Sequence, residues 1–169
     1  MIFKVLNFGV VGNVLESFVD NVFRDMVEPK IGSIVYCELA LGQAEHSGVY
    51  IGDNQIVHLD GSGFIEIVTP NQFMNRLGGW NTAISIYVSC HDSYAVGSEA
   101  IAKRAKEKVG SIRDYSLLLD NCHQFTSGCI SDNYENSDNF LWMLKNTANN
   151  YINANSWRIW ETVNGEYIS

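Results

Sequence analysis

Apolar residues recur every three or four positions in two stretches of the chain, which is the spacing of an amphipathic helix. The first stretch covers residues 13–26 and stops before Pro29. The second covers residues 98–109, with Ser98 as a suitable N-cap and Gly110 as a stop signal. We predict a helix in each. We interpret the first as a cover for the core rather than a membrane-surface helix, because its polar face is more acidic than basic.

Between these two stretches the apolar residues alternate with polar ones or form short runs, as they do in β-strands. The segments expected to form strands are residues 34–37, 46–51, 55–60, 64–68 and 83–88. The second and third segments are separated by Gly52, Asp53 and Asn54, which favour tight turns. The pattern therefore predicts about five antiparallel strands, two of which form a hairpin.

A further helix is predicted after the apolar run at residues 117–119. Asn121 is a suitable N-cap there, Cys122 occupies the first turn, and Gln124 stands where it can complete a capping box with Asn121. From residue 131 onward the chain is rich in Asn, but its large apolar residues argue against disorder. We predict a mobile loop at residues 131–138, followed by a packed helical segment.

Composition limits the class of protein. The chain has 169 residues, of which 46% are hydrophobic, enough for one sizeable core. We predict a single α+β domain with an N-terminal helical segment (1–28), a core (29–130), and an Asn-rich loop with a C-terminal helical segment (131–169). The formal net charge of −8 argues against a nucleic-acid partner, because phosphate binding needs clustered Lys and Arg.

Neither a cleavable signal nor a membrane-spanning helix is expected from the apolar stretches. The first 15 residues hold one basic residue and no small-residue cleavage site. No later stretch reaches the roughly 18 uninterrupted apolar residues of a spanning helix. We therefore predict a cytoplasmic protein with reduced cysteines, or delivery elsewhere by a leaderless route. Cys37, Cys90 and Cys129 are interpreted as small buried hydrophobic residues.

Cys122 is the candidate nucleophile. The unpaired N–H groups and the dipole at a helix N-terminus favour a thiolate over a thiol, and the same N–H groups can hold an oxyanion. A cysteine nucleophile also needs a base and a third group that orients the base. His46 and His58, at the two ends of the predicted hairpin, are the candidates for these roles.

The register of the hairpin decides whether the two histidines share a face, because side chains alternate along a strand. A two-residue turn at residues 53–54 would pair Val49 with His58. That register places His46 and His58 on opposite faces of the sheet, where they cannot cooperate.

A three-residue loop gives the other register and pairs Gly48 with His58. His46 then lies diagonal to His58 on the same face, and the small Gly48 leaves room between them. The catalytic hypothesis therefore predicts an odd-length loop, with Gly52 or Asn54 in the left-handed conformation that such a loop needs.

Three blocks in this order carry a resemblance to a known family. They are His46-Ser47-Gly48-Val49-Tyr50-Ile51-Gly52, then Ile56-Val57-His58-Leu59, then Tyr115-x-Leu117-x-x-x-Asn121-Cys122-x-x-Phe125 after a basic helix that ends at Gly110. Over roughly residues 29–130 the chain resembles the lecithin:retinol acyltransferase-like proteins. Those proteins are circularly permuted relatives of the NlpC-type, papain-fold cysteine hydrolases. The resemblance thus implies a permuted papain-like domain, with an antiparallel sheet packed against the helix that starts at the cysteine.

The resemblance also implies acyl transfer through a thioester, with Cys122 as the nucleophile, His46 as the general base and His58 as the polar residue that orients it. Water, an amine or a hydroxyl would then resolve the acyl-enzyme. The Cys122 backbone N–H is the expected oxyanion donor, and Gln43 and Asn121 are further candidates for substrate or oxyanion binding.

The chain departs from the vertebrate acyltransferases directly after the cysteine, where they usually carry Glu-His-Phe and this chain carries His123-Gln124-Phe125. We interpret His123 as a local hydrogen-bonding residue that points away from His46. The acyl donor is expected to be a small molecule, a lipid ester or a peptide. Two alternatives stay open: a peptidase or amidase of the NlpC type that uses Cys122 and His46, and a catalytically silent interaction module.

No cofactor and no metal site are expected. The cysteines lack the two- to four-residue spacing of structural zinc sites, and the adjacent pairs Cys90-His91 and Cys122-His123 suit a tetrahedral ion poorly.

Overall fold

The computed structural model describes residues 26–39, 44–75, 85–113, 121–163 and 166–167. Two of the sequence predictions lie outside these ranges. One is Gln43, the candidate for substrate or oxyanion binding. The other is the helix predicted over residues 13–26, except for its last residue, Met26, which lies in a short strand.

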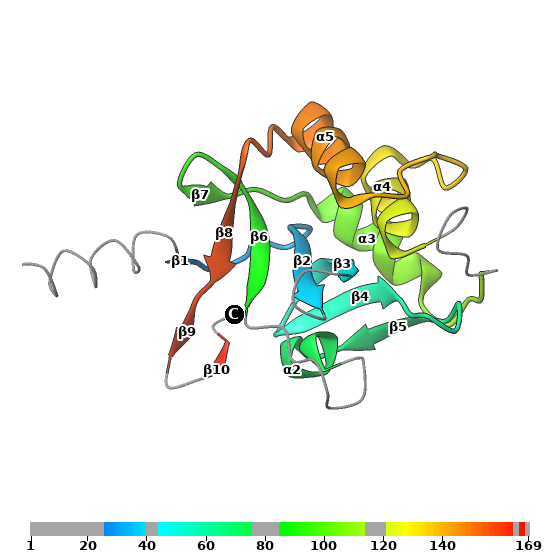
Figure 1. Cartoon of the computed structure of the whole chain (residues 1–169), viewed down its shortest axis with the longest axis horizontal. Helices are drawn as coiled ribbons and strands as arrows, with labels where there is room; N and C mark the ends of the chain where they lie inside the picture. Colours follow the sequence, from blue (N-terminus) through cyan, green and yellow to red (C-terminus); the bar gives the residue numbers. More distant parts are fainter. Residues whose placement is uncertain (1–25, 40–43, 76–84, 114–120, 164–165, 168–169) are drawn as a thin grey trace, which may run out of the picture.

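A mixed β-sheet forms the centre of the molecule (Figure 1). Its strands lie in the order β1-β8-β6-β2-β3-β4-β5, with β7 beside β6. Their bounds are β1 Met26–Val27, β2 Ile34–Leu39, β3 Ala44–Gly52, β4 Gln55–Leu59, β5 Ile65–Val68, β6 Ile86–His91, β7 Tyr94–Ala95 and β8 Ser156–Trp160. A separate two-stranded sheet consists of β9, Thr162–Val163, and β10, Glu166–Tyr167.

The predicted strands are present in this sheet, but the prediction of a purely antiparallel sheet is wrong at one edge. There β1 pairs with β8 in parallel, with Met26 opposite Ile159. Both strands come from segments that were predicted to be helical: β1 from the end of the first helix and β8 from the C-terminal segment. The α+β fold class is confirmed, and the arrangement is consistent with a permuted papain-like domain.

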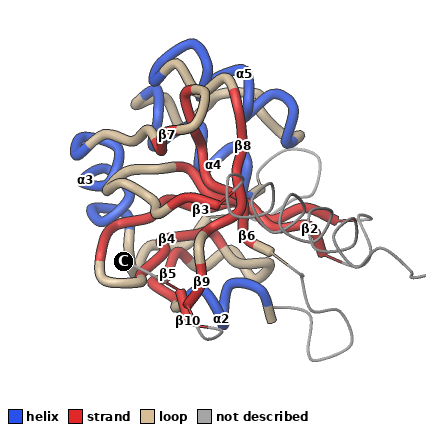
Figure 2. Tube along the Cα trace, turned by 90° about the vertical axis from the view of Figure 1, so that its left-hand side faces the viewer, coloured by secondary structure: helices blue, strands red, loops and turns tan. Residues whose placement is uncertain are grey.

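Three helices cover one face of the sheet: α3 (Glu99–Lys108), α4 (Cys122–Ser131) and α5 (Leu141–Ile152). The short helix α2 (Pro70–Met74) and the β9–β10 pair lie on the other side, as Figures 1 and 2 both show. Neighbouring residues along β2 divide between the two faces. Ile34 and Tyr36 pack against the helices, whereas Val35 and Cys37 join the cluster that contains Phe73 of α2. Both faces are therefore buried, which explains the continuous apolar run in β2.

The predicted mobile loop at residues 131–138 is tied to α4. The Gln124 side chain donates a hydrogen bond to the Asn136 backbone carbonyl, and the Asn136 side chain donates one back to the Gln124 carbonyl at 3.0 Å. In addition, the ring of Tyr134 packs against Phe125. None of the helices in the described part of the chain has the length and hydropathy needed to cross a bilayer.

The β3–β4 hairpin has the register that the catalytic hypothesis requires, but reaches it by a different route. Val49 pairs with Val57, as a three-residue loop would arrange, yet the turn itself has two residues, Asp53 and Asn54, and the register shifts between Tyr50 and Gly52. A β-bulge there supplies the odd residue that the loop was predicted to supply. The predicted loop length is therefore wrong, and the predicted register is confirmed.

The backbone conformation of this turn agrees with its residue types. Gly52, Asp53 and Asn54 have φ values of 98°, 51° and 53°. Two successive residues with positive φ make the kind of turn whose twist matches antiparallel strands, and Asn and Asp tolerate that conformation better than other residues with a side chain.

Candidate active site

The nucleophile candidate stands at the capped start of α4, as predicted. The Asn121 Oδ1 accepts hydrogen bonds from the backbone N–H groups of His123 and Gln124, at 2.9 and 3.2 Å. The reciprocal half of the capping box is wrong, because the Gln124 side chain donates to Asn136 and its buried Oε1 has no hydrogen-bond partner among the described residues. The Asn121 Nδ2 donates to the Asn139 carbonyl at 2.8 Å. Asn121 therefore joins the helix start to the loop after α4.

Cys122 is the first residue of α4, and its side chain is almost fully buried. Its Sγ lies 3.9 Å from the backbone carbonyl oxygen of Glu45 in β3. Burial raises the pKa of the thiol above its usual range, whereas hydrogen bonds from Ser47 and from the N–H groups at the helix start lower it. Burial is the larger effect. Sequence reasoning identified only the contributions that favour the thiolate.

His46 and His58 share a face of the sheet and are hydrogen-bonded to each other. The His46 Nε2 lies 2.7 Å from the His58 Nδ1, and the two rings meet edge to face. Both side chains are buried, His58 completely. The ring of Phe73 packs on His46, with ring centroids 4.8 Å apart. The predicted proximity of the two histidines is thus confirmed, and α2 adds a hydrophobic wall that the sequence did not reveal.

Gly48 explains why the two imidazoles can approach so closely. A Cβ at this position would lie 2.8 Å from the Val57 carbonyl oxygen and 3.2 Å from the His58 Cβ. The first distance is shorter than real side chains allow, so a residue larger than Gly would have to push β4 away from β3.

The hydrogen-bonded pair continues to a carboxylate. Glu66 of β5 is the cross-strand partner of His58, and its Oε1 lies 3.5 Å from the His58 Nε2. The Glu66 side chain is 34% exposed. Sequence analysis did not single out Glu66. Its place between Ile65 and Ile67 marked it as the polar residue of a strand, but the register between β4 and β5 could not be derived from the sequence.

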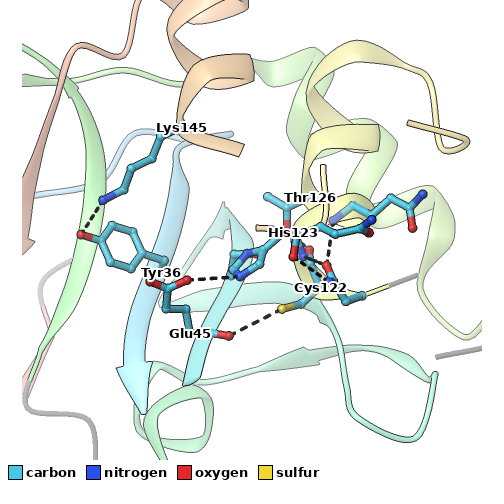
Figure 3. Close-up of polar contacts among 10 residues, drawn as sticks. Tyr36, Glu45, Cys122, His123, Thr126 and Lys145 are labelled. Carbon is cyan, nitrogen blue, oxygen red and sulfur yellow. Dashed lines mark hydrogen bonds and ion pairs between the residues drawn. The ribbon is translucent and has the colours of Figure 1, made fainter. Parts of the chain in front are cut away.

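The residue after His46 faces the opposite side of the sheet and forms a second network. The Ser47 Oγ lies 2.9 Å from the His123 Nδ1 and 3.2 Å from the Thr126 Oγ1. The Thr126 hydroxyl in turn donates to the Cys122 carbonyl at 2.7 Å. Figure 3 shows His123 and Thr126 beside Cys122 at the start of α4. The prediction that His123 is a local hydrogen-bonding residue is confirmed.

His123 is surrounded by polar atoms but is hard to protonate. Its Nε2 lies 3.9 Å from a carboxylate oxygen of Glu45, which is 41% exposed. Burial nevertheless lowers the pKa of His123 to about 4. The long contact with a half-exposed carboxylate does not offset the loss of hydration, so His123 is neutral at pH 7.

A lysine from α5 closes the same side of the sheet (Figure 3). The Lys145 Nζ donates to the Tyr36 hydroxyl at 3.0 Å and lies over the Tyr36 ring, 4.2 Å from its centroid. Burial lowers the pKa of Lys145 and raises that of Tyr36. This contact fixes α5 to β2 next to Glu45, which lies between Lys145 and the thiol in Figure 3.

The structure brings some of the predicted site residues together more closely than others. His46 and His58 are in direct contact, and Cys122 contacts β3 at Glu45 and Ser47, the two neighbours of His46 in the chain. Among the described residues, the polar partners of the thiol include both of these neighbours. Also within the described ranges, no three His, Cys, Asp or Glu side chains are grouped closely enough to bind a metal ion.

Comparison with known proteins gives one family and a few distant relatives. The family model described as lecithin retinol acyltransferase matches residues 27–135. The genome polyprotein of avian encephalomyelitis virus (strain L2Z) is 28% identical over 113 residues, which are 66% of this chain and 5% of the polyprotein. The corresponding polyprotein of the Calnek vaccine strain gives the same identity and coverage.

A mammalian protein is similar to the same degree. Lecithin retinol acyltransferase from Bos taurus is 29% identical over an alignment of 111 residues, with a coverage of 50% of this chain and 47% of the bovine protein. The chain therefore spans about half of the bovine relative and a small part of each viral polyprotein.

Proposed function

Since the chain belongs to the lecithin retinol acyltransferase family, we propose that it is a cysteine-dependent acyltransferase or hydrolase that forms a thioester on Cys122. The observation that carries the proposal is the 2.7 Å bond between the His46 Nε2 and the His58 Nδ1. A base needs a second group to hold its ring and tautomer, and this pair has that arrangement. The thiol contacts the backbone of β3 on both sides of His46.

In the proposed reaction the His46 Nδ1 takes the proton of the Cys122 thiol, because Nε2 is engaged with His58. The thiolate attacks the acyl carbonyl carbon, a carbon–sulfur bond forms, and the bond to the leaving alcohol or amine breaks. His46 returns the proton to that leaving group. Water or an acceptor hydroxyl or amine then attacks the thioester and regenerates the thiol. Catalytic hydrogen bonds are often long without substrate and shorten when it binds.

The developing oxyanion needs a donor near the thiol. Asn121 occupies the N–H groups of His123 and Gln124, so the Cys122 backbone N–H is the helix-start donor that we assign to the oxyanion. Asn121 then contributes by capping the helix. Gln43 stays a candidate for the second donor.

The substrate that we propose is an acyl ester, with a lipid ester as the first choice because of the family. The test is intact-mass spectrometry of the chain after brief incubation with a phospholipid, a short activated ester or a peptide amide. We expect a transient acyl adduct on the wild type and none on Cys122→Ser or His46→Ala. Cys129→Ser is a matched control, because Cys129 is a buried cysteine of the same helix.

The donor that gives the adduct identifies the chemistry. An adduct from the phospholipid or the activated ester supports the acyl-ester reading, and an adduct from the peptide amide alone would favour a peptidase. If no donor gives an adduct, and Cys122 alkylates no faster than an ordinary thiol at neutral pH, the chain is an interaction module instead of an enzyme.

A further inference from the structure

An acidic residue of β5, Glu66, lies next to the histidine pair because β5 pairs with β4. His58 and Glu66 face each other in the register of the two strands, with 3.5 Å between the His58 Nε2 and the Glu66 Oε1. His58 is fully buried, so water does not compete for its ring nitrogens. The Glu66 side chain, by contrast, is partly exposed to solvent.

A carboxylate accepts hydrogen bonds and cannot donate them, so it selects one tautomer of a neighbouring neutral imidazole. With the Glu66 carboxylate oxygen 3.5 Å from the His58 Nε2, charge favours the tautomer with the hydrogen on Nε2 and the lone pair on Nδ1. The opposite tautomer would place a lone pair against a negative charge.

The tautomer of His58 determines that of His46 through the 2.7 Å bond between them. One of the two nitrogens in that bond must donate, and the His58 Nδ1 is now an acceptor. The His46 Nε2 therefore carries its hydrogen, and the His46 Nδ1 carries the lone pair. That nitrogen is the one that must be unprotonated to take a proton from the thiol.

We propose that Glu66 is a positioning residue that acts through His58 to keep the lone pair of His46 on Nδ1, the nitrogen that acts as the base in the proposed reaction. The inference deepens the proposed function and rests on it. It adds a fourth member, from β5, to the order Cys122, His46, His58. The resemblance to the family assigns no role to this residue.

Other groups among the described residues also face the histidine pair and bear on the pH dependence. Cys37 of β2 pairs with His46 in the register of the sheet, and Phe73 of α2 packs on both rings. Phe73 is uncharged, and the Cys37 side chain is fully buried. On the other face of β3, a carboxylate oxygen of Glu45 lies 3.9 Å from the His123 Nε2. Glu66 is a carboxylate in contact with the pair that can be varied by itself.

The experiment compares Glu66→Gln and Glu66→Leu with the wild type by two measurements. The first is nitrogen NMR of the substrate-free protein labelled with ¹⁵N, which reads the tautomers of His46 and His58. The second is the alkylation rate of Cys122 as a function of pH. Glu107→Gln is the matched control, because Glu107 is an exposed Glu of α3 that contacts Lys103 and lies outside the site.

In the wild type we expect both histidines to carry their hydrogen on Nε2. Glu66→Gln keeps an acceptor oxygen, so we expect the same tautomers, but the acid limb of the pH profile moves to lower pH because a negative charge has been removed. In Glu66→Leu the acceptor is lost as well. We expect mixed tautomers and a fall in the alkylation rate of about tenfold, the lower end of the loss found when a carboxylate that orients a metal-bound imidazole is removed.

Wild-type tautomers with the hydrogen on the His58 Nδ1 would overturn the inference, and so would unchanged tautomers and pH profiles in both variants. Because Glu66 is at the surface, both variants should fold, and urea unfolding checks this. If Glu66→Leu fails to fold, the pH shift of Glu66→Gln decides. The two proposals can fail separately. Absent acyl adducts on the wild type together with altered tautomers would reject the proposed function alone, whereas normal adducts on Glu66→Leu with unchanged tautomers would reject this inference alone.

Discussion

Two neighbouring residues of β3 belong to two histidine networks on opposite faces of the sheet. His46 faces the α2 side and is bonded to a second imidazole, which in turn contacts Glu66. Ser47 faces the helices and is bonded to His123 and Thr126. Each network contains an imidazole and approaches a carboxylate at the surface, so a list of residue types would not distinguish them.

The partners of each imidazole make the difference. In the His46 network the two imidazoles are bonded to each other directly, and the second lies 3.5 Å from a carboxylate. In the Ser47 network the hydrogen bonds run through hydroxyls and end at the backbone carbonyl of Cys122, and His123 stays neutral because burial lowers its pKa to about 4. We infer that the first network transfers protons and the second holds the start of α4 against β3. Nearness to the nucleophile in the sequence is therefore a poor guide to the base, since His123 follows Cys122 directly.

The same substitution on the two faces tests this division most strongly. We expect His46→Gln to slow alkylation of Cys122 at pH 7 by about a hundredfold or more, because the general base is lost, and His123→Gln to change the rate by less than about threefold. Peptide mapping after iodoacetamide treatment gives the rate for Cys122 alone. An equal loss in both variants would mean that the proton-transferring imidazole lies on the helix side.

A substitution at Gly48 tests the close approach of β3 and β4. We expect Gly48→Ala to cost about 1 to 3 kcal/mol of unfolding free energy, because the new methyl group meets the Val57 carbonyl and the His58 Cβ. The same shift should separate His46 from His58 and slow alkylation of Cys122. Urea unfolding measures the first effect. Gly61→Ala is the control, since a Cβ there meets nothing within 4 Å. Equal unfolding free energies and equal alkylation rates in the two variants would show that the small size of Gly48 is not needed.

The smallest effect concerns the helix side and appears on acidification. The pKa of His123 is lowered from 6.5 to about 4 in the folded state, so the unfolded chain binds more protons between these values. The contribution to stability is therefore complete above pH 6.5 and is lost as the pH falls toward 4, by about 1 kcal/mol between pH 7 and 5.5.

The measurement is the urea midpoint of the wild type and of His123→Gln, which cannot titrate but can still donate to Ser47. The variant should lose less stability than the wild type over this pH range. His91→Gln serves as a control, because His91 is an exposed histidine. If the urea midpoints of the wild type and of His123→Gln fall in parallel as the pH is lowered, His123 does not resist protonation.

The local features of the site could be predicted from the sequence because short-range rules determine them. The Asn121 cap depends on residue types within one helical turn, and the His46–His58 contact depends on strand alternation with one choice of register. Both are properties of residues close together in the chain, for which the number of alternatives is small.

The features that the sequence did not reveal depend on distant segments. The contact of Glu66 with His58 requires the register across a second turn, which is fixed by the Asp60 side chain accepting hydrogen bonds from the N–H groups of Ser62 and Phe64. The parallel β1–β8 pair joins segments more than 120 residues apart, on the scale where sequence patterns carry no pairing information. The burial that raises the pKa of Cys122 likewise arises only when the helix packs against the sheet.

The bulge between Tyr50 and Gly52 determines which insertions and deletions this hairpin can tolerate during evolution. Loss or gain of a single codon there would leave the reading frame intact and every catalytic candidate in place, yet would turn His46 to the other face relative to His58. Insertions or deletions of two residues would keep the register, whereas those of one residue would not. Among descendants of this gene, the turn should vary in length by even numbers of residues. Where it varies by an odd number, His46 and His58 should be lost together.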